Sequence, residues 1–140
     1  MESYAELKDR QRKEFENLPI FWAFSKAQLA EGLKDFGLYE TETDQLRNLG
    51  GGGYCRKSDT HLIIDIMQRH DKELKESIAG DTTGEGFIFG MFDQELANHE
   101  YVVTYDTTDA LRALGITVDE IESTPAMKYG LKLAMRAQTE

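Results

Sequence analysis

The feature that most constrains the fold is a series of helix boundary signals that cuts the chain into short amphipathic segments. Ser25 and Gln28 have the spacing of a capping box, and Gly37 stands where a left-handed residue would close the helix they begin. A second capping box spans 117–120, and Pro125 stands at the favoured first position of a last helix. A chain punctuated this often predicts several short helices.

Longer helical patterns fill the first part and the middle of the chain. Apolar residues near one stripe predict a first helix that ends at Pro19, because proline lacks the amide needed to continue it. Two further helices are predicted over about 60–79 and 86–100. The face expected to be buried in the first of these two carries Ile63, Ile66, Met67, His70, Leu74 and Ile78.

Three apolar stretches read as strands. IFWAF at 20–24 suits a buried strand with Trp22 in the core, and LRNLGGGGYCR at 46–56 predicts two strands around a glycine turn, with Cys55 as a small buried residue. YVVTYD at 101–106 alternates like a strand. The chain of 140 residues is the usual size of one domain. We therefore predict an α+β fold: a helix-rich single domain over 1–140 with a small antiparallel sheet.

Charge narrows the class of partner. The chain has 26 acidic and 16 basic residues, a net charge of −10. Residues 59–110 alone hold 12 acids against three bases. Such a surface repels nucleic acid and attracts basic grooves, so we expect no direct nucleic-acid binding. No apolar run is long enough to cross a membrane, and a lone cysteine fits a reducing interior, so a cytoplasmic protein is expected.

Glu95 and His99 form the most conspicuous pair of ionisable residues. Residues four apart share a helix face, so the carboxylate could orient the imidazole for base catalysis. The pair could equally be an ion pair or hydrogen bond that closes the helix end, and this structural role is the one we expect. No serine or cysteine stands in a pattern typical of a nucleophile.

Neither a phosphate-binding loop nor a metal site is predicted. The glycine run at 50–53 is followed by Tyr54 and a strand-like sequence, whereas a P-loop requires Gly-Lys-Ser/Thr before a helix. A turn with positive φ is the better interpretation, and an anion or partner contact is the alternative. The H-E-x-x-H pattern fails at Val103. His61 and Asp65 share a helix face and could bind a cation, but the histidines are too scattered to predict a metal or cofactor.

Outer carboxylates of the two middle helices are the stronger functional candidates. If their outer faces are adjacent, they form an array of negative charge that could engage a groove built for phosphates. The predicted partner contacts are Asp65, Asp71, Glu73, Glu76, Asp93, Glu100, Gly52 and Tyr54.

The segments PIFWAFSKAQLAEGL, LGGGGYCRKSD, GFIFGMFDQELANHEYVVTYD and ALGIT together resemble a family of small uncharacterised proteins carried by phages and mobile elements. The resemblance covers about residues 4–125, and ELANHEY with the following TYD is its most specific part. It supplies no catalytic residues. It implies a short accessory gene in a phage-like genome, where antagonists of host defence such as anti-CRISPR proteins are common.

Three functions remain open at this point. The leading hypothesis is a non-enzymatic inhibitor in the host cytoplasm, whose acidic middle occupies the nucleic-acid channel of a defence nuclease. The alternative is a small enzyme or ligand-binding domain, dependent on a nucleotide or metal, centred on Glu95 and His99 with Tyr101 or Tyr105. The third is an interaction module that forms a homodimer through IFWAF, for which an exposed Phe21 or Trp22 would be the sign.

Overall fold

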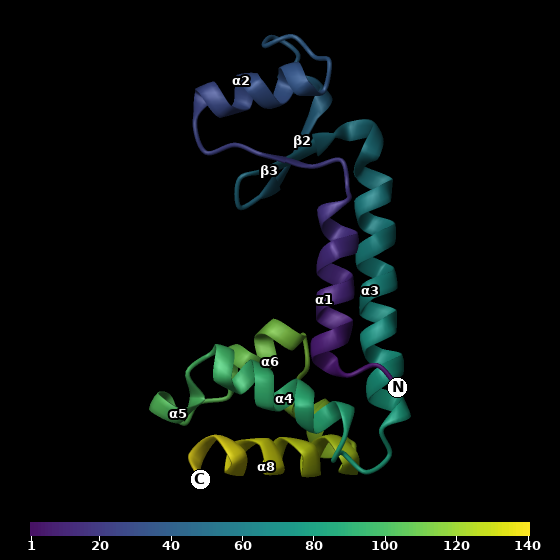
Figure 1. The fold of residues 1–140 in the computed structure, drawn as a ribbon, viewed down its shortest axis with the longest axis vertical. Coiled ribbons are helices and arrows are strands. Elements are labelled where there is room, and N and C mark those ends of the chain that lie inside the picture. The colour runs from purple at the N-terminus through teal and green to yellow at the C-terminus, as the bar shows by residue number, and fades with distance from the viewer. The chain divides into compact units, whose positions relative to one another are not determined.

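The computed structural model describes all 140 residues and combines many helices with a small antiparallel sheet (Figure 1). This confirms the predicted α+β class. The helices are α1 (Tyr4–Glu16), α2 (Lys26–Asp35), α3 (Thr60–Gly80), α4 (Phe87–Asn98), α5 (Tyr101–Thr104), α6 (Thr108–Leu114), α7 (Val118–Ser123) and α8 (Pro125–Thr139). The strands are β1 (Phe21–Trp22), β2 (Leu46–Gly50) and β3 (Gly53–Arg56), and short 3-10 turns occupy Thr43–Gln45 and Lys57–Asp59.

The chain packs into two compact units. The sheet unit comprises residues 12–70 and holds the three strands and α2, whereas the helical unit comprises residues 1–11 and 71–140 and holds α4 to α8. Helices α1 and α3 contribute residues to both units. The expectation of a single domain over 1–140 stays a prediction.

The sheet has strand order β1-β3-β2, and both pairings are antiparallel. The hairpin predicted from LRNLGGGGYCR is confirmed. Gly50, Gly51 and Gly52 have φ of 86°, 59° and 88°, values that residues with a side chain rarely adopt. The glycine run is therefore the tight turn that the sequence indicated.

Aromatic rings cover the two glycines at the end of this turn. A Cβ atom on Gly52 would lie 2.3 Å from the Phe24 ring, and one on Gly53 would lie 3.0 Å from the Trp22 ring. Trp22 is nonetheless 53% exposed and Phe24 75% exposed. The prediction that Trp22 belongs to the core is wrong, because Phe21 takes the inner side of β1 and packs against α2. The homodimer alternative stays a prediction, although it required such exposure.

The helix boundaries of α2 follow the sequence signals. The Ser25 hydroxyl accepts a hydrogen bond from the Gln28 backbone N–H at 3.2 Å, and the Gln28 side chain accepts from the Phe24 N–H at 2.7 Å. At the other end Gly37 has φ of 73°, and the N–H of Leu38 donates to the Leu33 carbonyl. This is a Schellman ending, which satisfies carbonyls that the helix leaves unpaired.

The core of the helical unit forms around α4. Ile88, Met91, Phe92 and Leu96 are fully buried at helical spacing, and Figure 1 shows α8 running alongside α4. Phe87 of α4 and residues from elsewhere in the helical unit complete this core: Tyr4, Leu7, Tyr101, Ala110, Leu111, Leu114, Ile116, Ile121, Met127 and Ala134. The short helices α5, α6 and α7 are thus held by the apolar side chains that they contribute.

The connection between α3 and α4 is fixed by one carboxylate and two glycines. Asp81 accepts hydrogen bonds from the backbone N–H groups of Thr83, Gly84, Gly86 and Ile88. A Cβ atom on Gly84 would lie 2.1 Å from the Ala126 carbonyl oxygen, and one on Gly130 would lie 2.7 Å from the Gly84 carbonyl oxygen. Both glycines are therefore required for the loop to approach α8.

Two further predictions about secondary structure and burial are wrong. YVVTYD is helix α5 with a closing turn, in which the Tyr105 N–H donates to the Tyr101 carbonyl at 2.7 Å. The β-branched pair Val102 and Val103 is exposed, and the sheet consists of β1, β3 and β2, so this segment does not pair with a strand. On α3, Met67 is 59% exposed, because it lies at the edge of the buried face that Ile63 and Ile66 define.

No helix combines the length and apolar character that crossing a bilayer requires.

Candidate functional site

Glu95 and His99 are close, but their main contact closes a helix end. Nδ1 of His99 lies 2.8 Å from the backbone carbonyl oxygen of Glu95 and 3.8 Å from the Glu95 carboxylate. His99 is also the residue that ends α4. The imidazole is thus held by main chain at the negative end of the helix, as the structural interpretation expects.

The Glu95 carboxylate itself points into the helical core. Its side chain is nearly buried, and it accepts hydrogen bonds from the Tyr4 hydroxyl at 3.0 Å and from the Asn98 amide at 3.3 Å. Burial and the adjacent Glu95 charge raise the pKa of the Tyr4 hydroxyl far above its usual value, so it remains a donor. The carboxylate therefore joins α1 to α4.

A pocket of about 450 Å³ does lie beside the segment that follows α4. Tyr101 of α5 and Tyr105, which directly follows α5, line one side, and Ile121 and Glu122 line it from α7. From α8 it takes Lys128, Leu131, Lys132, Met135, Arg136 and Thr139. All of these residues belong to the helical unit. We call this hollow the cationic pocket; its volume lies within the range of small-molecule sites.

The spacing of residues on α8 gives the cationic pocket two kinds of surface. Leu131 and Met135 are partly buried and supply an apolar floor together with Ile121. Lys128, Lys132 and Arg136 follow one another at four-residue intervals, so their charges form a row along the same side of the helix. Successive charges are separated by one helical turn, roughly 6 Å.

Two charges of this row have no partner in the protein. The other basic side chains of the helical unit are engaged. Lys8 lies over the Tyr4 ring, and ion pairs are formed by Arg10 with Glu2 and Glu73, Lys72 with Glu76, Lys75 with Asp71, Arg112 with Asp109, and Lys128 with Glu122. Only Lys132 and Arg136 remain, although this unit has 17 acidic residues against eight basic ones. Both unneutralised cations line the cationic pocket.

The backbone around α5 positions the two tyrosines. Glu100 and Tyr105 have φ of 56° and 57°, the left-handed region that residues with side chains seldom occupy. The Tyr101 and Tyr105 rings pack edge to face with centroids 5.7 Å apart, and Tyr105 is 65% exposed. Backbone strain of this kind is common where side chains are held for a ligand.

Asp106 fixes the chain directly after Tyr105. Its carboxylate accepts from the backbone N–H of Thr108 at 2.9 Å and from the Thr108 hydroxyl at 2.6 Å. These hydrogen bonds lower the pKa of Asp106 from its usual value. An ionised Asp106 thus anchors the start of α6 and, through it, the end of the α5 turn.

The predicted partner-binding carboxylates occupy several surroundings. Asp65 is exposed on the sheet-unit part of α3. Asp71 and Glu76 are exposed and pair with Lys75 and Lys72 of the same helix. Among the others, Glu73 accepts from Arg10 at 2.8 Å, Asp93 accepts from the Gln138 amide at 2.7 Å, and Glu100 is exposed.

Gly52 and Tyr54, predicted as an anchor for a partner, have structural contacts of their own. Gly52 lies under the Phe24 ring. The Tyr54 ring stacks on Phe21, with centroids 5.5 Å apart. Both residues remain partly exposed.

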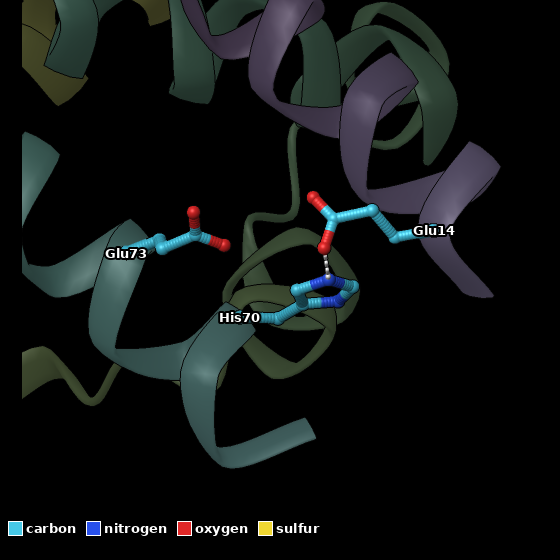
Figure 2. Close-up of side chains that lie close together, drawn as sticks. All are labelled: Glu14, His70 and Glu73. Atoms are coloured by element: carbon cyan, nitrogen blue, oxygen red, sulfur yellow. Dashed lines mark ion pairs between the residues drawn. The ribbon is translucent and has the colours of Figure 1, made fainter. Parts of the chain in front are cut away.

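A second histidine, His70, also lies beside a carboxylate. In the sheet unit, Nε2 of His70 lies 3.5 Å from the Glu14 carboxylate, and Figure 2 shows the two side chains facing each other. Glu73 follows one turn further along α3, in the part of this helix that belongs to the helical unit. Histidine and carboxylates are ligand types for divalent metals. Arg69 also forms an ion pair with Glu14, and Arg10 forms one with Glu73. His61 is exposed, and its Nδ1 lies 3.1 Å from the Ser58 carbonyl.

The sequence predicts only part of the cationic pocket. Tyr101 and Tyr105 are among the predicted candidates, although the sequence pattern places them on a strand. The pocket residues of α8 are not among the predicted candidates. The signal that could have identified them is the four-residue spacing of Lys128, Lys132 and Arg136, which is conspicuous in a chain this acidic.

Comparison with known proteins gives one match. No curated protein and no solved structure is significantly similar to the chain. The model of a family of unknown function matches residues 3–137, nearly the whole chain. The chain therefore belongs to the family of unknown function DUF7659.

Proposed function

We propose that the helical unit is a ligand-binding module that holds a small organic anion with an apolar or aromatic body in the cationic pocket. The observation that carries this proposal is the pair of unneutralised cations, Lys132 and Arg136, beside an apolar floor. On an acidic unit, cations that make no internal ion pair gain most from an external anion.

The two surfaces of the pocket would act together. Apolar atoms of the ligand gain roughly 25 cal/mol per Å² when they leave water for the floor formed by Ile121, Leu131 and Met135. An exposed ion pair contributes little binding free energy on its own, so the two cations mainly select a ligand that carries negative charge. A dissociation constant in the micromolar range, about −8 kcal/mol, is the expected scale.

A direct test uses 8-anilinonaphthalene-1-sulfonate, an aromatic probe with one negative charge. Titration of the full chain at low salt, followed by probe fluorescence, should give saturable binding. The double variant Lys132→Gln/Arg136→Gln should bind about tenfold more weakly, since a tenfold change corresponds to about 1.4 kcal/mol.

The matched control is Lys26→Gln/Lys34→Gln, which changes the net charge equally on α2 of the sheet unit. This control should bind the probe like the unmodified protein. If both double variants lose the same affinity, general electrostatics explain the binding and the cationic pocket is not its site.

A second candidate function is the acidic inhibitor of a host defence nuclease, of the anti-CRISPR kind, in the cytoplasm of a cell infected by a phage that carries the gene. The favouring observation is the charge of the helical unit, 17 acids against eight bases, with exposed Asp71, Glu76 and Glu100. Such carboxylates can compete with phosphates for a basic channel. The resemblance to phage proteins adds context and no residue roles.

This second candidate is tested by charge reversal. Reversing Asp93 would also break its hydrogen bond with Gln138. The test therefore uses Glu76→Lys/Glu100→Lys. This pair should abolish inhibition of DNA cleavage by a purified CRISPR effector, whereas Glu31→Lys/Glu40→Lys in the sheet unit should not. Inhibition that survives the first pair, or that is absent from the unmodified protein, would contradict nucleic-acid mimicry by this surface.

A further inference from the structure

We infer that the ligand class of the cationic pocket is a nucleoside monophosphate bound without a divalent cation, an inference that rests on the proposed ligand-binding function. Three features of the pocket carry it: its aromatic wall, the number of its unneutralised charges, and the absence of an available carboxylate among its lining residues.

The aromatic wall favours a planar ring over an aliphatic chain. Tyr105 is largely exposed and is braced edge to face by the nearly buried Tyr101. Met135 also lines the pocket, and a thioether makes favourable contacts with aromatic rings. Stacking on an aromatic side chain tolerates any base, so the wall selects a base without choosing among the four.

The charge of the pocket matches one phosphate. Lys128 is neutralised by Glu122 at 3.0 Å, which leaves Lys132 and Arg136. A phosphate monoester carries a charge of about −1.5 to −2 near neutral pH, which two cations balance. Additional phosphates would add charge that the acidic helical unit repels, so a triphosphate or a nucleic-acid strand fits less well.

The lining residues offer no carboxylate for a metal ion. Nucleotide sites that use Mg²⁺ hold it with one or two carboxylates. Glu122 is the only acidic lining residue, and it is engaged by Lys128. The cations of α8 therefore take the place of the metal, and Mg²⁺ in solution would compete with them for the phosphate.

The experiment is calorimetric titration of the full chain at pH 7.5 and low salt with EDTA. Adenosine 5′-monophosphate, adenosine and inorganic phosphate are separate probes. The monophosphate should bind at least tenfold more tightly than either other probe. Its affinity should not rise with 10 mM MgCl₂, and it should fall at pH 5, because the second phosphate pKa is about 6.

Two variants separate the two halves of the pocket. Lys132→Gln/Arg136→Gln should weaken the monophosphate about tenfold and leave adenosine unchanged. Tyr105→Leu, which keeps the left-handed backbone position occupied by a side chain, should weaken both nucleoside probes. Lys26→Gln/Lys34→Gln should change neither.

Each contrary outcome has a defined meaning. If the naphthalene probe binds the Lys132→Gln/Arg136→Gln variant more weakly, but the monophosphate neither binds nor displaces the probe, the nucleotide inference is overturned and the proposed function stands. Equal binding of inorganic phosphate and monophosphate, or a requirement for Mg²⁺, also overturns the inference. If the Lys132→Gln/Arg136→Gln variant binds both ligands as tightly as the unmodified protein does, both proposals fail.

Discussion

The hydroxyl of Tyr4 is the contact on which the buried carboxylate of Glu95 most depends. It links two residues 91 positions apart in the sequence, in the interior of the helical unit. A buried charged acceptor that loses a donor pays a desolvation penalty that water does not relieve. The pair of Tyr4 and Glu95 is therefore a structural element of the core.

Tyr4→Phe should lower the free energy of unfolding by about 1–3 kcal/mol, because it removes the donor and keeps the ring. Urea unfolding followed by circular dichroism measures the change. Tyr129→Phe is the matched control, since the Tyr129 hydroxyl makes only an exposed 3.4 Å contact with Glu85. Equal losses in the two variants would show that the Tyr4 hydroxyl contributes nothing specific.

The left-handed backbone of Glu100 gives a second prediction at this scale. Glu100→Gly should raise stability by about 1 kcal/mol, because glycine adopts a φ of 56° without the steric cost of a Cβ atom. Thermal unfolding gives the measurement. Glu100→Ala removes the same carboxylate and keeps the Cβ atom, so it should bring no such gain; a gain in both variants would point to charge instead of strain.

At the scale of elements, the packing of α8 decides whether the cationic pocket exists. Its floor residues on α8 lie opposite side chains of α5 and α7. The position of α8 along α4 is set in turn by the close approach of Gly84 and Gly130. Protein interiors are so closely packed that an added methyl group forces neighbouring atoms to move, which destabilises the fold.

Gly130→Ala should destabilise the protein by roughly 1–3 kcal/mol, because the new methyl group would lie 2.5 Å from the Ile88 side chain and 2.7 Å from a backbone oxygen. Gly90→Ala, also in a helix but with no atom within 4 Å of the added methyl group, should be neutral or slightly stabilising. A thermal unfolding series on both variants measures the difference. If Gly130→Ala is as stable as Gly90→Ala, the loop does not hold α8.

Asp81 couples the same loop to pH. Burial raises the pKa of its carboxyl, but the hydrogen bonds from the loop backbone outweigh burial and hold the pKa below the usual 3.8. A depressed folded-state pKa contributes stability that is complete above the unfolded pKa and is lost as pH falls through the folded value. The stability difference between the unmodified protein and Asp81→Asn should thus be constant from pH 5 to 7 and shrink below about pH 4. A difference that persists unchanged at pH 2.5 would contradict this account.

Short sequence patterns predict helices and turns better than they predict how these elements pack against one another. The caps at Ser25 and Thr117, the turn at Gly50–Gly52 and the start of α8 all follow from chemistry within a few residues. YVVTYD was assigned wrongly because alternation cannot reveal whether a partner strand exists. The cationic pocket escaped prediction for the same reason, since its walls come from segments up to 38 positions apart.

At the scale of the whole molecule, charge is divided unevenly between the two units. The helical unit has 17 acids and eight bases, and the sheet unit has nine acids and eight bases. Self-repulsion therefore falls almost entirely on the unit that carries the cationic pocket.

Raising NaCl from 20 mM to 500 mM should increase the free energy of unfolding by on the order of 1 kcal/mol, because salt screens this repulsion. Glu76→Lys/Glu100→Lys should show a smaller increase, since it removes part of the excess charge. Chemical denaturation with urea, which leaves ionic strength unchanged, gives the comparison. A fall in stability with salt would mean that the ion pairs of the unit outweigh its net charge.

The exposed indole of Trp22 has a consequence for observing how the chain unfolds. It is the only tryptophan, and it lies in the sheet unit, whereas α4 to α8 lie in the helical unit. Its emission spectrum therefore follows one unit, and the backbone ellipticity follows mainly the other. Coincident denaturation curves from the two signals would establish one cooperative domain over 1–140, and separated curves would establish two. The chain thus carries its own reporter of cooperativity, with no label required.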